Sequence, residues 1–309
     1  MIYTLTLNPG LDKEYTVPFI QHNQVLRTSS IRTDIGGKGF NISRMLNKLG
    51  CQSIALGFVG GFTGKLLREG LEKLGIATDL IETADESRTN TSIVDEQGNH
   101  YIKVNEPGPH ISTSELTRLS GKVSDLAKPG DWWILSGSLP RGVPEHFYAH
   151  VIEVISEKGA YAVLDTSANP LRLGCRAHPF LIKPNLFEAG ELAGVKADNL
   201  HQSYKLVPIL HKFGVQNIVI SAGDTGALLS NGSTIWLGKP PFVQELNPIG
   251  AGDAMLAGMI KSMACGETIE QAFALGIACG AAAASLPGTG MPDKEYVEDV
   301  LKQVKVKKI

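Results

Sequence analysis

The sequence lacks a strong charge of either sign, closely spaced cysteines and long hydrophobic runs. Its 29 Lys and Arg residues against 31 Asp and Glu residues give a formal net charge of −2, which argues against a nucleic-acid-binding protein or a polybasic membrane surface. The four cysteines form no Cys-x-x-Cys pair, so we expect free thiols in a reducing compartment. No apolar run reaches the roughly 18 residues of a membrane span, and the first residues do not resemble a signal peptide. We therefore expect a cytoplasmic protein with no nucleic-acid partner and no membrane partner.

Several common active-site motifs are also missing. The eight histidines show no paired metal-ligand spacing. Residues 60–65 resemble a phosphate-binding P-loop, but the motif is one residue short and Leu66 replaces its Ser or Thr. The dinucleotide fingerprint and the nucleophile elbow of serine hydrolases are absent as well. Hydride transfer and serine hydrolysis therefore have no support in the sequence.

What the chain does have is an alternation of predicted strands and helices along its 309 residues. The expected strands span residues 2–7, 53–59, 131–136, 160–165, 180–182 and 217–221. The expected helices span residues 40–49, 64–74, 114–126, 145–157, 186–193 and 204–213. Alternation at these lengths predicts an α/β fold whose mostly parallel sheet is covered on both faces. Ligands of such sheets bind at the carboxyl ends of the strands.

Two β-rich segments, residues 14–34 and 89–104, do not fit this alternation. The second contains a hairpin signal at Gln97-Gly98-Asn99. Together the two segments predict a small antiparallel sheet beside the main domain. Such a sheet could be a flap over an active site or an additional edge sheet, and the pattern alone does not choose between them.

The stretch from Asn247 to Ala254 combines a glycine turn with the start of a predicted helix. Gly250, Ala251 and Gly252 would present backbone N–H groups and the positive end of the helix dipole to an anion, most often a phosphate. Asp253 lies in the first turn of that helix. It is either an ordinary helix-start residue, which the local sequence favours, or a catalytic base.

Other polar residues follow predicted strands. Asp165 ends one strand, and Lys183 and Asn185 follow the next. Asn185 and Glu188 have a spacing that suits Mg²⁺ bound through water, although a helix capping box is its commoner meaning. The turn over residues 221–226 could line a nucleotide pocket or be a simple hairpin turn.

Taken in order, three motifs resemble the ribokinase-like (PfkB) family of carbohydrate kinases. They are Gly36-Gly37-Lys38-Gly39-Phe40-Asn41, Lys183-Pro184-Asn185-x-x-Glu188 and Gly250-Ala251-Gly252-Asp253. Together with the first motif, residues 4–12 and 136–140 resemble the branch that phosphorylates ketohexose monophosphates. Lys38 is similar to the residue of 1-phosphofructokinases and tagatose-6-phosphate kinases, and Asn247-Pro248 is similar to the second of these.

The resemblance implies one ribokinase-like domain over residues 1–309, a three-layer α/β/α fold with a β lid formed by about residues 13–35 and 88–105. It also implies ATP- and Mg²⁺-dependent phosphorylation, with fructose 1-phosphate as the first expected substrate and tagatose 6-phosphate as the second. A kinase of unphosphorylated sugars or nucleosides and a catalytically silent sugar-phosphate sensor are the alternatives. The lid would also pair two subunits into a homodimer.

The resemblance assigns roles to individual residues as well. Asp253 would be the base, and Gly250, Ala251 and Gly252 would form the anion hole. The other groups are the nucleotide contacts Lys183, Asn185, Ser221, Gly223 and Gly226, the water-mediated Mg²⁺ ligands Asn185 and Glu188, the sugar contacts Asp12, Gly37 and Asn41, and the contacts to the sugar's own phosphate Arg88, Lys38, Arg27, Lys103 and Ser138.

Overall fold

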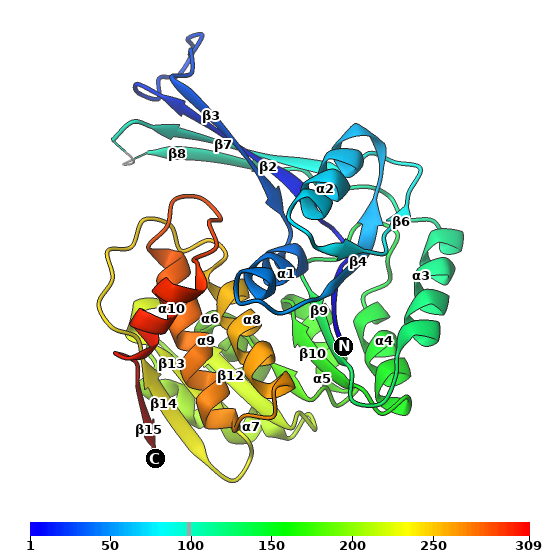
Figure 1. Ribbon diagram of the computed structural model, residues 1–309, viewed down its shortest axis with the longest axis vertical. Coiled ribbons are helices and arrows are strands. Elements are labelled where there is room, and N and C mark those ends of the chain that lie inside the picture. Colours follow the sequence, from blue (N-terminus) through cyan, green and yellow to red (C-terminus); the bar gives the residue numbers. More distant parts are fainter. Residues whose placement is uncertain (98–99) are drawn as a thin grey trace.

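The computed structural model describes residues 1–97 and 100–309, and a long twisted sheet runs through its main body (Figure 1). The strand order is β15-β14-β13-β12-β11-β10-β9-β1-β4-β5, and β6 also pairs with β4. The parallel part consists of β1 (Ile2–Thr6), β4 (Ile54–Val59), β5 (Ala77–Thr78), β6 (Ile81–Glu82), β9 (Trp132–Ser136), β10 (Tyr161–Asp165), β11 (Leu181–Ile182) and β12 (Asn217–Ser221). The antiparallel end consists of β13 (Ala227–Ser230), β14 (Ile235–Lys239) and β15 (Lys305–Lys308).

Helices cover both faces of this sheet, because its central strands are apolar on both sides. In β9, Trp133 and Leu135 face one buried cluster while Trp132 and Ile134 face another. One face carries α1 (Lys38–Lys48), α8 (Ala251–Ala264), α9 (Ile269–Ala284) and α10 (Lys294–Leu301). The other carries α3 (Thr113–Leu126), α4 (Phe147–Glu157), α5 (Ala168–Cys175), α6 (Leu186–Ala193) and α7 (Val207–His211). The predicted three-layer α/β/α architecture is therefore confirmed.

A second sheet, which we call the lid, projects from the main body (Figure 1). Its strand order is β3-β2-β7-β8, with β3 (Ser30–Gly36), β2 (Gly10–Val17), β7 (Arg88–Asp95) and β8 (Tyr101–Asn105). The prediction of an antiparallel sheet was wrong for the central pair, since β2 and β7 run parallel. A long crossover through α1 and α2 (Gly61–Lys73) separates these two strands in the chain, and such a crossover allows parallel pairing. The hairpin predicted at Gln97-Gly98-Asn99 has its tip outside the described residues.

Most other predicted elements are observed within a few residues of their expected bounds, and two differences stand out. The helix expected over residues 204–213 is divided into a 3₁₀ turn, η1 (His201–Lys205), and α7, whose first turn contains Pro208. Proline removes a backbone donor, so it is tolerated at a helix start and not in its interior. The lid begins at Gly10, three residues before the expected boundary, which places Asp12 on a lid strand. Within residues 1–97 and 100–309, no helix combines the length and apolar character that a membrane crossing requires.

Candidate active site

The start of α8 is built as an anion-binding turn. Gly250 precedes the helix with φ = 86°, a left-handed conformation that glycine adopts without strain. The N–H group of Ala251 donates to the carbonyl of Pro248 at 3.2 Å, so this group is less free than the sequence predicted. The N–H group of Gly252 has no acceptor in the described part of the chain. A Cβ atom added at Gly252 would lie 3.1 Å from Nζ of Lys183, so glycine brings the turn close to this cation.

Asp253, the third residue of α8, is buried with a single fixed partner. The amide Nδ2 of Asn41 donates to its Oδ2 at 2.9 Å, and no hydrogen bond occupies Oδ1 among the described residues. Burial raises the pKa of Asp253 from 3.8 to about 6, although the nearby charge of Lys38 opposes this shift. A helix N-terminus should lower the pKa of a carboxyl group, but here the loss of hydration outweighs it. The side chain is therefore a stronger base than its position in the helix suggests.

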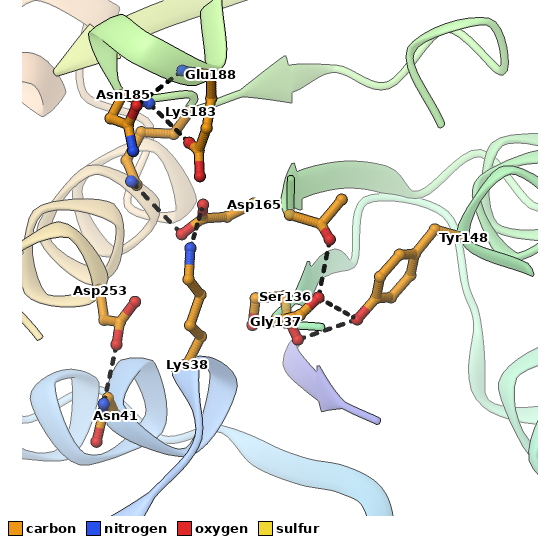
Figure 2. Close-up of polar contacts among 11 residues, drawn as sticks. Lys38, Asn41, Ser136, Gly137, Tyr148, Asp165, Lys183, Asn185, Glu188 and Asp253 are labelled. Carbon is orange, nitrogen blue, oxygen red and sulfur yellow. Dashed lines mark hydrogen bonds and ion pairs between the residues drawn. The ribbon is translucent and has the colours of Figure 1, made fainter. Parts of the chain in front are cut away.

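Asp165 lies at the carboxyl end of β10 and pairs with two lysines (Figure 2). Nζ of Lys38 donates to its Oδ1 at 2.9 Å, and Nζ of Lys183 lies 3.5 Å from its Oδ2. Burial favours the neutral carboxyl, but the charges of Lys183 and Lys38 outweigh burial and keep the pKa of Asp165 below its ordinary value. Partial burial likewise opposes the charge of Lys38, while Asp165 and Asp253 raise the pKa of this lysine. We call Lys38, Asn41, Asp165, Lys183 and Asp253 the transfer group.

Asp165 received no role from the sequence, although its position at a strand end was a usable signal. Lys38 was expected beside the sugar's own phosphate, but the structure places it at Asp165 and near Asp253. The ammonium group thus lies between two carboxylates of the transfer group (Figure 2).

A pocket of about 730 Å³ opens beside the α8 turn, and we call it the α8–α9 pocket. Its volume is typical of small-molecule sites. One wall is made by the small residues Gly280, Ala281 and Ala284 of α9. The remaining lining includes the turn residues Ser221, Gly223 and Gly226, the chain from Lys239 to Glu245, and Ala251 and Gly252. Its apolar wall reaches the N–H group of Gly252, which is unpaired among the described residues, and Lys183 lies close to this glycine. An apolar wall that ends at an anion-binding turn fits a nucleoside triphosphate.

The turn between β12 and β13 is the hairpin turn that the sequence left as one alternative. The N–H group of Ala222 donates to the carbonyl of Gly226, and residues 223–225 form one 3₁₀ turn. Ser221, Gly223 and Gly226 also line the α8–α9 pocket. The same turn can therefore serve as the wall of a nucleotide pocket, which was the other alternative.

Asn185 and Glu188 form the capping box at the start of α6. Oδ1 of Asn185 accepts from the N–H group of Glu188 at 2.8 Å, and Oε2 of Glu188 accepts from that of Asn185 at 2.9 Å. The described residues contain no cluster of three or more His, Cys, Asp or Glu side chains suited to a metal ion. Glu188 nevertheless lies near Lys38 of the transfer group, as Figure 2 shows. This donor set fits a cation that keeps most of its waters, as Mg²⁺ does, and does not fit a directly ligated metal.

A second set of polar side chains lies where the lid meets the main body, and we call it the lid group: Asp12, Arg88, Asn90 and Lys103. Nδ2 of Asn90 donates to Oδ1 of Asp12 at 2.8 Å. Burial raises the pKa of Asp12, while the charges of Lys103 and Arg88 lower it. Nε of Arg88 donates to the carbonyl of Asn8 at 3.1 Å and Nη1 to that of Glu106 at 3.4 Å. The guanidinium is thus held by carbonyl groups and keeps N–H groups for an anion.

Three further predicted residues have different positions. Gly37 has φ = 124°, and a Cβ atom there would lie 3.0 Å from Thr6, so its backbone approaches the end of β1. Ser138 lies on the loop after β9, and its Oγ accepts from Nδ2 of Asn8 at 3.4 Å. Arg27 is exposed in the connection between β2 and β3, at the far end of the lid from Gly10 and Gly36. The structure therefore does not bring Arg27 to the site of its own chain, because the two extended strands carry it away.

Comparison with known proteins identifies the family of the chain. The family model described as "pfkB family carbohydrate kinase" matches residues 12–295. The chain belongs to the pfkB family of carbohydrate kinases. A 1-phosphofructokinase of Borreliella burgdorferi is 36% identical over 100% of this chain and 99% of its own length. A tagatose-6-phosphate kinase of Staphylococcus epidermidis is 30% identical over 99% of both chains.

The fold of the chain is also similar to that of a solved phosphofructokinase structure. The crystal structure of phosphofructokinase-2 from Escherichia coli in complex with substrates and products is similar, with a TM-score of 0.92 and 27% identity over 98% of each chain. The family resemblance and the ribokinase-like fold predicted from sequence motifs are thus confirmed. The roles of the individual site residues stay predictions.

Proposed function

We propose that the protein transfers the terminal phosphoryl group of ATP to a hydroxyl group of a ketohexose monophosphate, with fructose 1-phosphate as the first substrate. The observation that carries this proposal is the α8 turn, where Gly252 lines the α8–α9 pocket and the next residue, Asp253, is a buried carboxylate. A phosphoryl donor in the pocket would therefore end beside a base. Family membership makes the protein a phosphotransferase with an alcohol group as acceptor.

The choice of a phosphorylated sugar is supported by charge and by the relatives. Arg88 is half-buried and bonded to two backbone carbonyls, and Lys103 lies near Asp12 on the same sheet. The carboxylate of Asp12 lies near both cations, and a neutral sugar would bring them no further anion. A phosphate, in contrast, suits a guanidinium group. Fructose 1-phosphate precedes tagatose 6-phosphate because the 1-phosphofructokinase is 36% identical and the tagatose-6-phosphate kinase 30%.

Each side chain of the transfer group has a defined task in this proposal. Oδ1 of Asp253 accepts the proton of the acceptor hydroxyl, while Asn41 holds the other carboxylate oxygen. The N–H group of Gly252 and the ammonium groups of Lys38 and Lys183 stabilise negative charge between the pocket and Asp253. Asp165 pairs with both lysines and holds them in place. Asp12 and Asn90 would bind the sugar from the lid side.

Mg²⁺ would neutralise charge on the phosphates of ATP, and this chain would hold it through water. One oxygen of Glu188 is committed to the capping box, which leaves the other to orient a hydrated cation. Asn185 fixes the direction of Glu188 through the same pair of hydrogen bonds. The capping box and the metal role are therefore compatible.

A substrate panel tests the proposal. The protein is incubated with Mg·ATP and fructose 1-phosphate, tagatose 6-phosphate, fructose 6-phosphate, fructose, ribose or adenosine, and ADP release is followed. We expect fructose 1-phosphate to give the highest kcat/KM, at least tenfold above tagatose 6-phosphate. Faster turnover of tagatose 6-phosphate would reverse the order of the two substrates. Equal turnover of unphosphorylated sugars would exclude the proposed specificity, and sugar-phosphate binding without turnover would identify a sensor.

We also propose that the lid pairs two copies of the chain. Several apolar side chains are exposed on the lid and on the connection between β2 and β3: Phe19, Val25, Ile31, Tyr101, Ile102 and Val104. An apolar edge strand of this kind is normally covered, and a second lid has the matching chemistry. The four cysteines are free thiols, which favours the reducing cytoplasm as the location.

A further inference from the structure

Arg44 is a half-buried arginine on α1 that the proposed chemistry does not use. Its Nη1 atom donates to three neutral acceptors: Oδ1 of Asn41 at 3.0 Å, the carbonyl of Ile35 at 3.2 Å and Oγ1 of Thr289 at 3.3 Å. The three hydrogen bonds hold the guanidinium group in one position, and no carboxylate forms an ion pair with it in the described part of the chain.

The first of these contacts determines the orientation of the Asn41 amide. An amide has one accepting oxygen and one donating nitrogen. Because Oδ1 of Asn41 accepts from Arg44, its Nδ2 faces Asp253 and donates to Oδ2 at 2.9 Å. The reverse orientation would place the amide oxygen against the Asp253 carboxylate and the amide nitrogen against a cation. Arg44 and Asn41 lie three residues apart on one helix face, which is the spacing that allows this contact.

The other two contacts anchor Arg44 from outside α1. Ile35 belongs to β3, the lid strand that leads into Gly36 and Gly37. Thr289 is buried, and its Cβ atom lies 4.0 Å from the place of a Cβ atom at Gly250, in the turn before Asp253. The guanidinium is therefore held by the lid and by the segment beside the α8 turn.

We propose that Arg44 is a positioning residue, which fixes the Asn41 amide so that it donates to the carboxylate of Asp253. This inference rests on the proposed function, because it assigns Asp253 the role of base. Within the described residues Arg44 has no hydrogen bond or ion pair to Asp253, and it acts through Asn41.

The charges around Asp253 determine in which direction its pKa should move when Arg44 is replaced. Lys38 and Arg44 face it from α1, Asp165 faces it from the end of β10, and Lys183 faces it from the chain after β11. The two lysines and the Asn41 hydrogen bond lower the pKa of Asp253, whereas burial and Asp165 raise it. Removing Arg44 takes away one positive charge and frees the amide to turn. Both changes disfavour the ionised carboxylate and raise the pKa of Asp253 further.

The variant Arg44→Met tests the proposal through the pH dependence of kcat/KM for the sugar phosphate between pH 5 and 9. We expect the midpoint of the acid limb to move upward by at least half a pH unit. The substrate phosphate also titrates near pH 6, but it contributes equally to the parent and to the variant. Lys48→Met is the matched control, since it removes an exposed cation from the same helix and should leave the midpoint unchanged.

A loss of folded protein that is equal at every pH lowers the whole profile and leaves its midpoint in place, so the folded fraction is measured across the same pH range. An Arg44→Met midpoint within about 0.2 pH units of the parent, which is less than ~0.3 kcal/mol in the ionisation of Asp253, would overturn the proposal. The second measurement introduces Arg44→Met into Asn41→Ala, where we expect less than half of the original shift. Equal shifts in both backgrounds would show that Arg44 does not act through Asn41. If the parent itself lacks turnover or an acid limb, the proposed function fails, and the two failures are thereby distinguishable.

Discussion

The transfer group and the lid group differ in how much of their structure is complete before a ligand arrives. Asn41, Asp165, Lys183 and Asp253 are between 1% and 6% exposed, and each has a fixed neighbour. In the lid, every residue of β8 is exposed, and Lys103 is among them. Arg88 is half-buried, as is Lys38 of the transfer group, but Lys38 pairs with the buried Asp165 whereas Arg88 is bonded to carbonyl groups.

This difference separates two tasks. A buried carboxylate with a fixed partner is arranged for proton transfer before the substrate binds, so it should influence kcat. Exposed cations on a sheet gain strength only when a substrate excludes water from them, so they should influence KM. Three sets of substitutions test this division, in order of decreasing effect.

Asp253→Asn should abolish the function of the transfer group. Loss of a positioned base costs roughly 10² to 10⁴ in rate, and we expect kcat to fall by about 10³ with KM values for both substrates within about threefold of the parent. Steady-state kinetics with fructose 1-phosphate and ATP measure both quantities. A kcat within about tenfold of the parent, which is only ~1.4 kcal/mol in barrier, would remove Asp253 from the role of base.

The thermal stability of the same variant provides a control that does not depend on activity. The folded-state pKa of Asp253 is raised to about 6 from 3.8, so the folded protein binds an extra proton between these values and its stability decreases as pH rises through them. Above about pH 6 Asp253 is ionised, and the buried charge lowers the free energy of unfolding by its full amount. Asp253→Asn removes this cost, so its Tm should exceed that of the parent at pH 8 and approach it toward pH 5. If the Tm of Asp253→Asn is lower than that of the parent at pH 8, the ionised Asp253 does not destabilise the folded protein, and the prediction is wrong.

The pair Arg88→Ala and Lys38→Met compares one cation from each group. Loss of a charge-assisted hydrogen bond costs about 1.5–3 kcal/mol, or roughly 10- to 150-fold. We expect Arg88→Ala to raise KM for the sugar phosphate by about this factor with little change in KM for ATP. Lys38→Met should instead lower kcat, because Lys38 lies between Asp165 and Asp253. If both variants raise KM for the sugar phosphate equally, Lys38 belongs functionally to the lid group.

The transfer group was more accessible to prediction than the contacts that hold it together. Glycines before a helix and polar residues after buried strands are local patterns, so the α8 turn, Lys183 and the capping box of Asn185 and Glu188 were found from sequence. The pairing of Asp165 with Lys38 joins residues 127 positions apart. No local pattern specifies such a contact. Arg44 was not predicted because its contact to Thr289 and the hydrogen bond from Asn41 to Asp253 join residues 245 and 212 positions apart.

In the fold, too, elements that local sequence determines were predicted, and elements that depend on distant contacts were not. Strands of the parallel core were predicted because they are continuous apolar runs, as in β12. The strand β15 was missed because three of its four residues are lysines, and only pairing with β14 at the sheet edge makes it a strand. The parallel pairing of β2 and β7 likewise depends on the crossover between them and not on either segment alone.

The smallest effect on chemistry should come from the outer edge of the lid. Val104 is 58% exposed on β8, and Val104→Glu should place two like charges together wherever two lids meet. We expect sedimentation velocity to show a dimer for the parent and a monomer for the variant, with kcat within about threefold because the transfer group lies in the main body. Leu66→Glu on α2, at 53% exposure, is the matched control and should keep the parent's mass. If the parent is a monomer, or if Val104→Glu remains a dimer, the lid does not pair the subunits, and its apolar residues need another partner.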